Sequence, residues 1–469
     1  MTDSTRNSDG AGSAVVAAFV GSASYDDAAA VRALVEQSLD ALDLPDAFVR
    51  PGDRVVLKPN WVKEHDERTP GPDRWEHIVT HPTVIEAVAR WAAGRLGGRG
   101  SIVICDAPQT DSSFARLREY CDLDAMLDRC RAAVPGLDIQ LLDLRPEEWH
   151  AVDGVTVDKR ALPGDPRGAT HVRLNAASEF VDFAGNGRLY GASYDMAETN
   201  FVHQGTRHEY MLCRTPMDAD VLINLPKLKT HKKVGVTCAL KNLVGINANK
   251  NWLPHHTEGT PDAGGDQFPA STAKARLEHA WMGTAKRWLK NRPALSRAFV
   301  PVKKAARLYF GDTQKVVRSG NWHGNDTCWR MVLDLNKCLF SFDGSGAPRR
   351  EPLRYLAVVD GIVGGEGNGP MAADPKPCGV IIAGTNPVAV DCVAATTMGF
   401  DFRKLRLLSE GFRARAPSLV GFAADEITVV SNRDAWRGPM SEMDDTFAFR
   451  PHFGWVGAIE RARRSTEGV

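Results

Sequence analysis

The 469-residue chain lacks the sequence patterns of iron–sulfur proteins, membrane-spanning proteins and nucleic-acid-binding proteins. Its nine cysteines are scattered and never spaced as CxxC, so we expect reduced thiols and no iron–sulfur cluster. No stretch reaches the roughly 18 consecutive apolar residues of a membrane span. The formal net charge is zero at pH 7, so the charge totals favour neither nucleic acid nor a membrane surface as a partner. These absences predict a cytoplasmic protein without a membrane or nucleic-acid partner.

Nucleotide-binding fingerprints are also missing. No P-loop GK[ST] occurs anywhere in the chain. The glycine-rich stretch DGIVGGEGNGP at 360–370 contains no clean GxGxxG between a strand and a helix. NAD and ATP are therefore disfavoured as cofactors.

Length and patterning divide the chain into four predicted parts. The first twelve residues lack the basic and apolar regions of a signal peptide and are predicted to be a disordered tail. The parts are the tail 1–12, an N-terminal α/β domain 13–250 that contains the active-site segment 220–256, a loop and helical insertion 251–345, and a C-terminal α/β domain 346–469.

Short apolar strands alternate with helical patterns in both predicted domains. In the first, strands at 14–21 and 54–57 flank a helix at about 26–42, and a third strand lies at 101–106. This alternation is typical of mostly parallel sheets covered by helices. We therefore predict an α/β fold with two α/β lobes, each on a mostly parallel sheet, with an inserted helical subdomain and a long loop.

The segment 220–256 carries the strongest functional signal. The apolar run 221–225 ends at Pro226 and predicts a buried parallel strand. A basic loop follows directly, with Lys227, Lys229, His231, Lys232 and Lys233 in seven residues. A helix is then predicted from Gly235. A strand end, a basic loop and a helix amino terminus together suit an anion.

A solvated lysine-rich surface beside an ordinary helix would give the same charge run. The adjoining strand and helix favour the anion site, because ligands of α/β sheets bind at the carboxyl ends of strands. Lys58 and Asn60 follow another predicted strand and should lie at the same edge. The predicted substrate-binding residues are Lys58, Asn60, Lys227, Lys229, Lys232 and Asn242.

Four residues are predicted to be catalytic. A lysine that is desolvated among other cations loses pKa and can act as a base, which suits Lys241. The imidazole of His231 titrates near neutral pH and could move a proton. Asp360 and Glu366 are predicted on a flexible glycine loop facing the same cleft, as acid/base partners or metal ligands. Turn residues on a tight loop are the alternative interpretation of these two acids.

A metal site is a further hypothesis. His231, His255 and His256 are the predicted ligands, and imidazole with carboxylate donors suits one divalent transition metal without choosing which. No segment has a spacing as diagnostic as HExxH.

Five motifs together resemble one family. They are VVLKPNW, DADVLINLPKLKTHKKVGVTCALKNLVGI, WHGND, VVDGIVGGEGNGP and NPVAVD, and they are similar to the domain of unknown function 362 family over about residues 50–400. The family is largely uncharacterised, so the resemblance implies little chemistry. Some members carry a ferredoxin-like domain with cysteine runs, which this chain lacks.

A more distant resemblance is to the lactate racemases, which hold a nickel pincer cofactor between two α/β domains. His231 is similar in position to a histidine of that family, and Lys241 to its cofactor lysine. His255 or His256 falls where a metal-binding histidine would lie. The stretch 105–111 has no histidine where the racemases have one, and Thr237-Cys238-Ala239 replaces their small glycine pair.

The sequence predicts an enzyme of small anionic metabolites, either carboxylated or phosphorylated. It would act by acid/base chemistry of the isomerase or epimerase kind at an inter-domain cleft, with or without a metal, in a biosynthetic pathway. Two alternatives stay open: a non-catalytic binding protein for the same kind of metabolite, and a redox protein related to the iron–sulfur members of the family.

Overall fold

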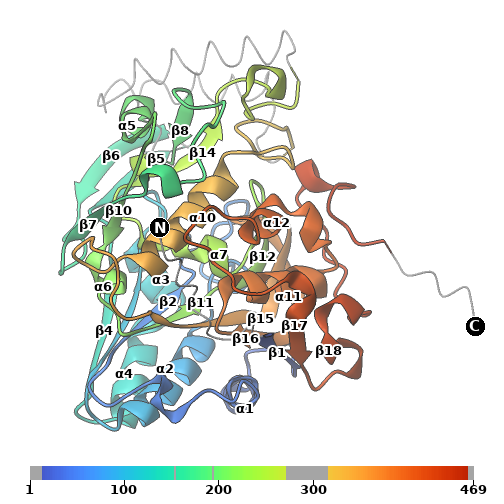
Figure 1. The fold of residues 1–469 in the computed structure, drawn as a ribbon. Helices are drawn as coiled ribbons and strands as arrows, with labels where there is room; N and C mark the ends of the chain where they lie inside the picture. The colour runs from blue at the N-terminus through green and yellow to red at the C-terminus, as the bar shows by residue number, and fades with distance from the viewer. Residues whose placement is uncertain (1–12, 153–154, 193–194, 271–314, 463–469) are drawn as a thin grey trace, which may run out of the picture.

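The computed structural model describes residues 13–152, 155–192, 195–270 and 315–462, and Figure 1 shows their helices around one large sheet. Strands and helices alternate along most of these residues, which confirms the α/β class. The predicted tail 1–12 and the helical part of the predicted insertion, 271–310, lie outside the described residues.

The main sheet has eleven strands in the described part of the chain. In spatial order they are β18 (Gly438–Pro439), β17 (Ile427–Val430), β1 (Ala14–Val20), β16 (Ala372–Gly384), β15 (Arg354–Asn368), β11 (Val221–Leu225), β2 (Arg54–Pro59), β3 (Ser101–Asp106) and β4 (Asp138–Asp143), with β12 (Lys227–His231) beside β15 and β13 (Gly235–Thr237) beside β12.

Most neighbouring pairs in this sheet are parallel, as expected. β11 pairs in parallel with β2 on one side and with β15 on the other. β1, from the beginning of the chain, lies between β16 and β17 from its last third. Strands from both predicted lobes therefore belong to one continuous sheet. The candidate site lies at one edge of that sheet.

Helices cover both faces of the sheet (Figure 1). One face packs against α1 (Ala28–Asp40), α2 (Pro82–Leu96), α3 (Phe114–Tyr120) and α4 (Leu123–Ala133). The other face packs against α7 (Ala239–Asn242), α10 (Cys328–Ser341), α11 (Pro387–Met398) and α12 (Arg406–Gly411).

The sequence of β11 explains how two cores form. Successive side chains of a strand point to opposite faces. Val221, Ile223 and Leu225 lie in the core beneath α1 and α2, and Leu222 lies in the core beneath α10 and α11. Asn224 shares the face of Leu222, so this strand presents one buried amide to the side on which the candidate site lies.

The other strands and helices form smaller sheets and short segments outside the main sheet. They are β5 (Glu147–Val152) with β6 (Val155–Ala161), β7 (Ala169–Arg173) with β10 (Arg207–Cys213) and β9 (His203–Gln204), β8 (Leu189–Gly191) with β14 (Pro254–Thr257), α5 (Met196–Val202) and α6 (Arg214–Met217). β7 and β10 pair in antiparallel orientation.

The structure corrects the prediction for the segment after β11. The predicted basic loop is the strand β12, all of it buried. The predicted helix from Gly235 is the strand β13, followed by the short helix α7 and a 3₁₀ turn over Leu243–Ile246. Gly235 has a φ of +85°, and β13 pairs with β12 in an antiparallel hairpin, so a helix cannot begin there. Helix-like apolar spacing arises because the whole segment is buried.

The predicted glycine loop is also a strand. β15 continues through its glycines to Asn368 and pairs with β12 and β16. A Cβ at Gly365 would lie 3.0 Å from Lys229 Cβ, and one at Gly369 would lie 2.0 Å from Thr230 O. These glycines therefore allow β12 to approach closely, and they do not form a flexible loop.

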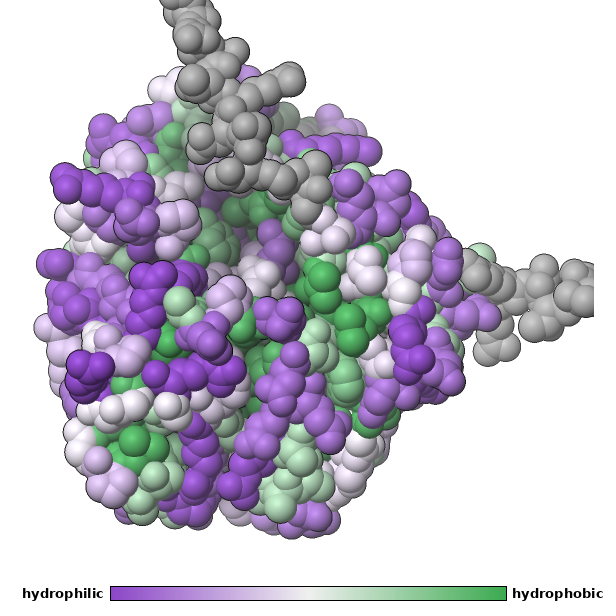
Figure 2. Space-filling view, turned by 60° about the horizontal axis from the view of Figure 1, so that its bottom comes forward, coloured by the Kyte–Doolittle hydropathy of each residue, from purple (hydrophilic) through white to green (hydrophobic). Residues whose placement is uncertain are grey.

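Helix length and surface hydropathy determine how a protein can contact a membrane. None of the helices in the described ranges is long and apolar enough to cross a membrane. On the face shown in Figure 2, hydrophilic and hydrophobic residues are interspersed, with apolar residues around a hollow near its middle.

Candidate functional site

The floor of the candidate site lies where β2 and β3 end. Lys58 Nζ lies 2.7 Å from Asp106 Oδ1, and both side chains are buried. Asp106 also accepts hydrogen bonds from the backbone N–H groups of Trp61 and Ala107. Gly245 passes directly over the pair, since a Cβ there would lie 2.0 Å from Asp106 Oδ1 and 2.6 Å from Lys58 Nζ. The buried ion pair therefore requires glycine at this position.

Three asparagines extend this floor. Asn242 Oδ1 accepts from Lys58 Nζ at 3.2 Å and from Asn60 Nδ2 at 2.8 Å, and Asn242 Nδ2 donates to Asn224 Oδ1 at 2.7 Å. Asn60 Oδ1 accepts from Lys229 Nζ at 2.9 Å. The structure thus brings together four of the predicted substrate-binding residues: Lys58, Asn60, Lys229 and Asn242. Their polar groups are hydrogen-bonded to one another, so this network fixes the shape of the site and supplies its lysines.

Two lysines above this floor have free ammonium groups. Lys232 and Lys241 are partly exposed, and neither amine has a hydrogen-bond or ion-pair partner among the residues that the structure describes. Burial lowers the pKa of Lys241, and the nearby charges of Lys58 and Lys232 lower it further. The amine of Lys241 thus lies among the other cations, as the sequence predicted.

Lys233 and Lys250 complete the set. Burial lowers the pKa of each of these amines to about 8. Lys233 Nζ donates to the carbonyl oxygens of His255 and Ser319, and Lys250 Nζ donates to Ala107 O at 2.8 Å. We call the following residues the cation cluster: Lys58, Lys229, Lys232, Lys233, Lys241, Lys250, His231 and His255.

The two histidines of the cluster have opposite hydrogen-bonding roles. His231 Nδ1 accepts from the backbone N–H groups of Lys233 and Val234, so its ring proton is on Nε2. His255 Nδ1 lies 2.9 Å from Leu253 O and must donate to it, so Nε2 of His255 keeps a lone pair. Burial and neighbouring lysines lower the pKa of both rings well below 6.5. His231 can therefore donate a hydrogen bond from Nε2, and His255 can accept one at Nε2. The sequence did not predict the acceptor role of His255.

Lys227 differs from Lys232 and Lys241 because its ammonium group has a carboxylate as counter-ion. Its Nζ lies 2.9 Å from Asp360 Oδ2 and 2.6 Å from Tyr25 Oη. Asp360 also accepts from Tyr25 Oη and from the backbone N–H groups of His81 and Ile362. All acceptor positions of the Asp360 carboxylate are thus occupied by groups of the protein. The predicted catalytic role requires a position that is free for a substrate.

Glu366 also has partners of its own. Its carboxylate bonds Arg450 Nε at 2.9 Å and lies 3.6 Å from Lys376 Nζ. Lys376 lies on β16 and Arg450 near the end of the chain, and neither belongs to the cation cluster. The structure therefore does not bring Glu366 to His231 or Lys241.

The three predicted metal ligands do not form a metal site. No group of three or more His, Cys, Asp or Glu side chains suited to a metal occurs in the described residues. His256 stacks on Tyr190 at a centroid distance of 4.6 Å, and its Nδ1 lies 3.4 Å from Lys233 Nζ. Divalent cations are repelled by the surrounding ammonium groups. The residues present therefore do not fit the predicted divalent metal.

The motifs that signalled the site have structural roles as well. In NPVAVD, Asn386 accepts from the backbone N–H groups of Val388 and Ala389 and begins α11. Asp391 of α11 accepts from Ala239 N at 2.6 Å and from Leu240 N at 3.0 Å, so it holds the first turn of α7. Sequence reasoning missed this role, and it missed Lys250, which follows no strand and belongs to no charge run.

The fold and the cluster define an α/β protein with a cation-lined site at one edge of its sheet. Residues 166–396 match the family described as Domain of unknown function (DUF362). The match confirms the family resemblance, and it includes β11, β12, α7, Lys250 and Asp391. The resemblance to the lactate racemases stays a prediction.

A curated relative is the thylakoid-associated protein sll1697 of Synechocystis sp. (strain ATCC 27184 / PCC 6803 / Kazusa), which is 24% identical over 354 residues. The match covers 76% of this chain and 65% of the relative, so the chain spans less than two thirds of the relative's length. A crystal structure of a protein from Thermotoga maritima covers 48% of this chain and 39% of its own, at 12% identity and a TM-score of 0.25. A similarity that low carries no argument.

Proposed function

We propose that the protein is an enzyme that binds a small carboxylated or phosphorylated metabolite at the cation cluster and moves a proton on it. The observation that carries this proposal is the pair of free ammonium groups, Lys232 and Lys241, above a floor that already holds four further lysines. Of the cluster lysines, Lys58 lies in an ion pair, with Asp106. An anionic ligand would relieve the repulsion among these cations.

The groups around such a ligand suit proton transfer. Lys241 has a lowered pKa, so a larger share of its amine is neutral and can accept a proton. The free lone pair of His255 Nε2 can accept a second one, and the Nε2–H of His231 can donate a hydrogen bond to a developing negative charge. This arrangement supports isomerase or epimerase-like chemistry at a carbon beside the anionic group.

Binding is tested by calorimetry with citrate and inorganic phosphate at fixed pH. In Lys232→Ala and Lys241→Ala, we expect the affinity for these anions to fall at least about tenfold, since each variant loses a charge-assisted contact. Lys159→Ala is the matched control, because Lys159 is exposed on β6 and lies against Trp149. Unchanged affinity in both cluster variants would refute the site.

Catalysis is tested separately with Lys241→Arg. Arginine keeps the positive charge but does not give up its proton at accessible pH. We expect this variant to keep anion binding and to lose exchange of carbon-bound hydrogen in D₂O, followed by NMR over a panel of 2-hydroxy and 2-oxo acids. Retention of exchange in Lys241→Arg would exclude Lys241 as the base. Binding without exchange in the unaltered protein would support the alternative, a non-catalytic binding protein.

Redox function is not favoured by the thiols. All nine cysteines are buried and free, and burial raises the pKa of those at 105, 121, 130, 213, 238, 328, 338, 378 and 392. A raised pKa leaves little thiolate to react or to bind a metal. A cytoplasmic location and a role in biosynthesis remain proposals, and cell fractionation tests the former against the thylakoid association named for the relative.

A further inference from the structure

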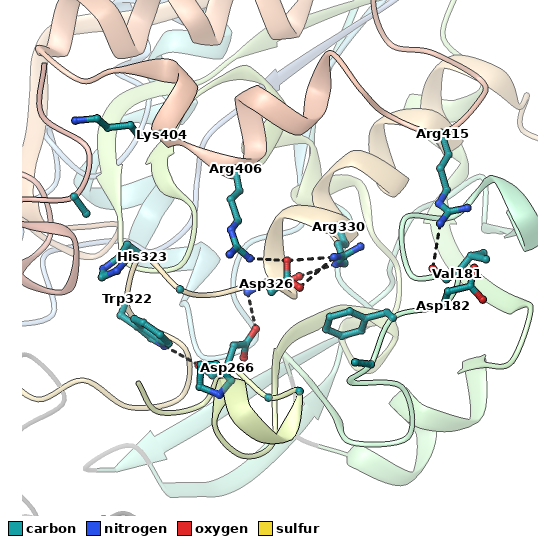
Figure 3. A pocket seen from close by; sticks show the side chains of 17 residues that line it. Val181, Asp182, Asp266, Trp322, His323, Asp326, Arg330, Lys404, Arg406 and Arg415 are labelled. Atoms are coloured by element: carbon teal, nitrogen blue, oxygen red, sulfur yellow. Dashed lines mark hydrogen bonds and ion pairs between the residues drawn. The ribbon is translucent and has the colours of Figure 1, made fainter. Parts of the chain in front are cut away.

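A separate cavity of about 860 Å³ opens between α10, α12 and two loops. Its volume lies within the roughly 300–1,000 Å³ typical of small-molecule sites. None of the residues of the cation cluster lines it. Figure 3 shows the cavity with Arg330, Arg406 and Arg415 on one side and Trp322 and Asp266 on the other.

Four cationic side chains line the cavity with three carboxylates, those of Asp182, Asp266 and Asp326. Asp326 Oδ1 bonds Arg406 Nη1 at 2.8 Å, and Asp326 also bonds Arg330 at 3.1 Å, so two guanidinium groups share one carboxylate. Lys404 and Arg415 line the same cavity, and neither has a carboxylate within ion-pair distance in the described residues. Lys404, Arg406 and Arg415 are exposed and can reach a ligand.

Asp266 does not neutralise these cations, because its oxygens are occupied. It accepts from Thr257 N at 2.7 Å, from Asp326 N and Thr327 N at 2.9 Å each, and from Thr327 Oγ1 at 2.6 Å. Its side chain is buried in the wall between the cavity and the cation cluster, near Lys233.

Apolar and aromatic side chains also line the cavity. Trp322 is fixed by a hydrogen bond from Nε1 to Asp266 O at 2.8 Å, which turns its ring along the wall. Phe183 packs beneath the Arg330 guanidinium at 4.7 Å. Pro261, Ala184 and Ala458 line the remaining surface. Aromatic side chains beside exposed guanidinium groups suit a ligand with a flat apolar part and an anionic end.

We propose that this cavity binds an organic anion with an apolar body, a carboxylate or a phosphate ester, at a site distinct from the cation cluster. Arg406 and Arg415 hold the anionic group, since both are exposed, whereas Arg330 is partly buried and bonds Asp326 and the carbonyl oxygen of Glu179. The apolar body lies against Trp322 and Phe183. A guanidinium holds carboxylate and phosphate by paired hydrogen bonds, so both classes remain candidates.

The test uses 1-naphthyl phosphate, 1-naphthoate and the neutral 1-naphthalenemethanol, titrated calorimetrically into the full chain. We expect one of the two anions to bind at least tenfold more tightly than the neutral alcohol, and the preferred anion identifies the class. In the double variant R406Q/R415Q, affinity for that anion should fall at least tenfold. R403Q is the matched control, because Arg403 is exposed nearby and does not line the cavity.

Two results would overturn the proposal. One is equal binding of the alcohol and both anions; the other is undiminished anion binding in R406Q/R415Q. A circular dichroism spectrum and melting temperature that match the unaltered protein show that the variant is folded, since the exposed Arg406–Asp326 pair contributes little to stability. Lys232→Ala should leave unchanged the part of naphthyl binding that R406Q/R415Q removes. A loss of naphthyl binding there, with R406Q/R415Q unaffected, would assign the ligand to the cation cluster.

Discussion

Neighbouring lysines on one strand have different functions in this protein. Lys227 and Lys229 are two residues apart on β12 and are both fully buried. Lys227 is neutralised by Asp360, whereas Lys229 donates to the uncharged oxygens of Asn60 and Ile78. The first lysine is therefore part of the scaffold. The second has no carboxylate partner, and burial together with the neighbouring lysines lowers the pKa of its amine.

We predict that Lys227→Met destabilises the protein by about 3–5 kcal/mol, because it leaves the buried carboxylate of Asp360 without a counter-ion. Urea unfolding measures the loss. The control is Lys376→Met, whose partly exposed pair with Glu366 should contribute less than about 1 kcal/mol. The double variant Lys227→Met with Asp360→Asn should recover part of the loss. A cost below about 1 kcal/mol for Lys227→Met would contradict the structural role.

Gly245 offers a second test at the scale of one residue. We predict that Gly245→Ala costs about 1–3 kcal/mol and weakens citrate binding, because the added Cβ would collide with the Lys58–Asp106 pair. The control is Gly94→Ala in α2, where a Cβ meets nothing within 4 Å. It should stabilise the protein by about 0.5–1 kcal/mol, since glycine is unfavourable inside a helix. Thermal and urea unfolding compare the two variants, and equal effects would count against the close approach.

At the scale of elements, α7 depends on a residue far away in the sequence. α7 has only four residues, too few to be stable alone. Asp391, 152 residues from Ala239, binds its first two N–H groups. Lys241 and Asn242 are carried by this turn, so α11 positions part of the cation cluster.

We predict a pH-dependent role for Asp391. Burial raises its pKa to about 7 from the ordinary 3.8. Between these values the folded state binds the extra proton, so this group's contribution to stability falls as the pH rises from about 4 to 7. In Asp391→Asn that fall disappears, and the stability difference between the two proteins should shift by more than about 1 kcal/mol over this range. Urea unfolding at pH 5 and 7.5 measures it, and a constant difference would refute the prediction.

For the molecule as a whole, the cation cluster contrasts with a net charge of zero. Long-range attraction of anions is therefore weak, and binding depends on the local protonation of the lysines. Added salt should reduce affinity moderately, because partly buried charges are screened less than exposed ones.

We predict that sulfate, whose charge is constant in this range, binds more weakly as the pH rises from 7 to 9. The pKa of Lys233 and of Lys250 is about 8, and a bound anion raises both, so binding takes up protons. Each amine that is coupled in this way should contribute a fall of about tenfold. Calorimetry in buffers of different ionisation enthalpy counts the protons. Lys250→Met should show a shallower fall, and affinity independent of pH would contradict the coupling.

The sequence by itself determined the α/β class, the elements β1, α1, β2 and β3, and the basic segment after β11. Apolar periodicity records local burial, and charge runs are visible without a partner, so these features follow from neighbours along the chain. The position of Lys241 among other cations also followed from the segment around it.

Only the tertiary structure decided which charges are free. Lys227 looks like Lys229 in sequence, and its partner Asp360 is 133 residues away. The segment after β11 forms two strands where a basic loop and a helix were predicted, because β12 and β13 pair with each other and β12 pairs with the glycine-rich β15. The hydrogen-bonding roles of His231 and His255 depend on which backbone groups lie beside each ring. Pairing across the sheet is a long-range property, and a local pattern does not encode it.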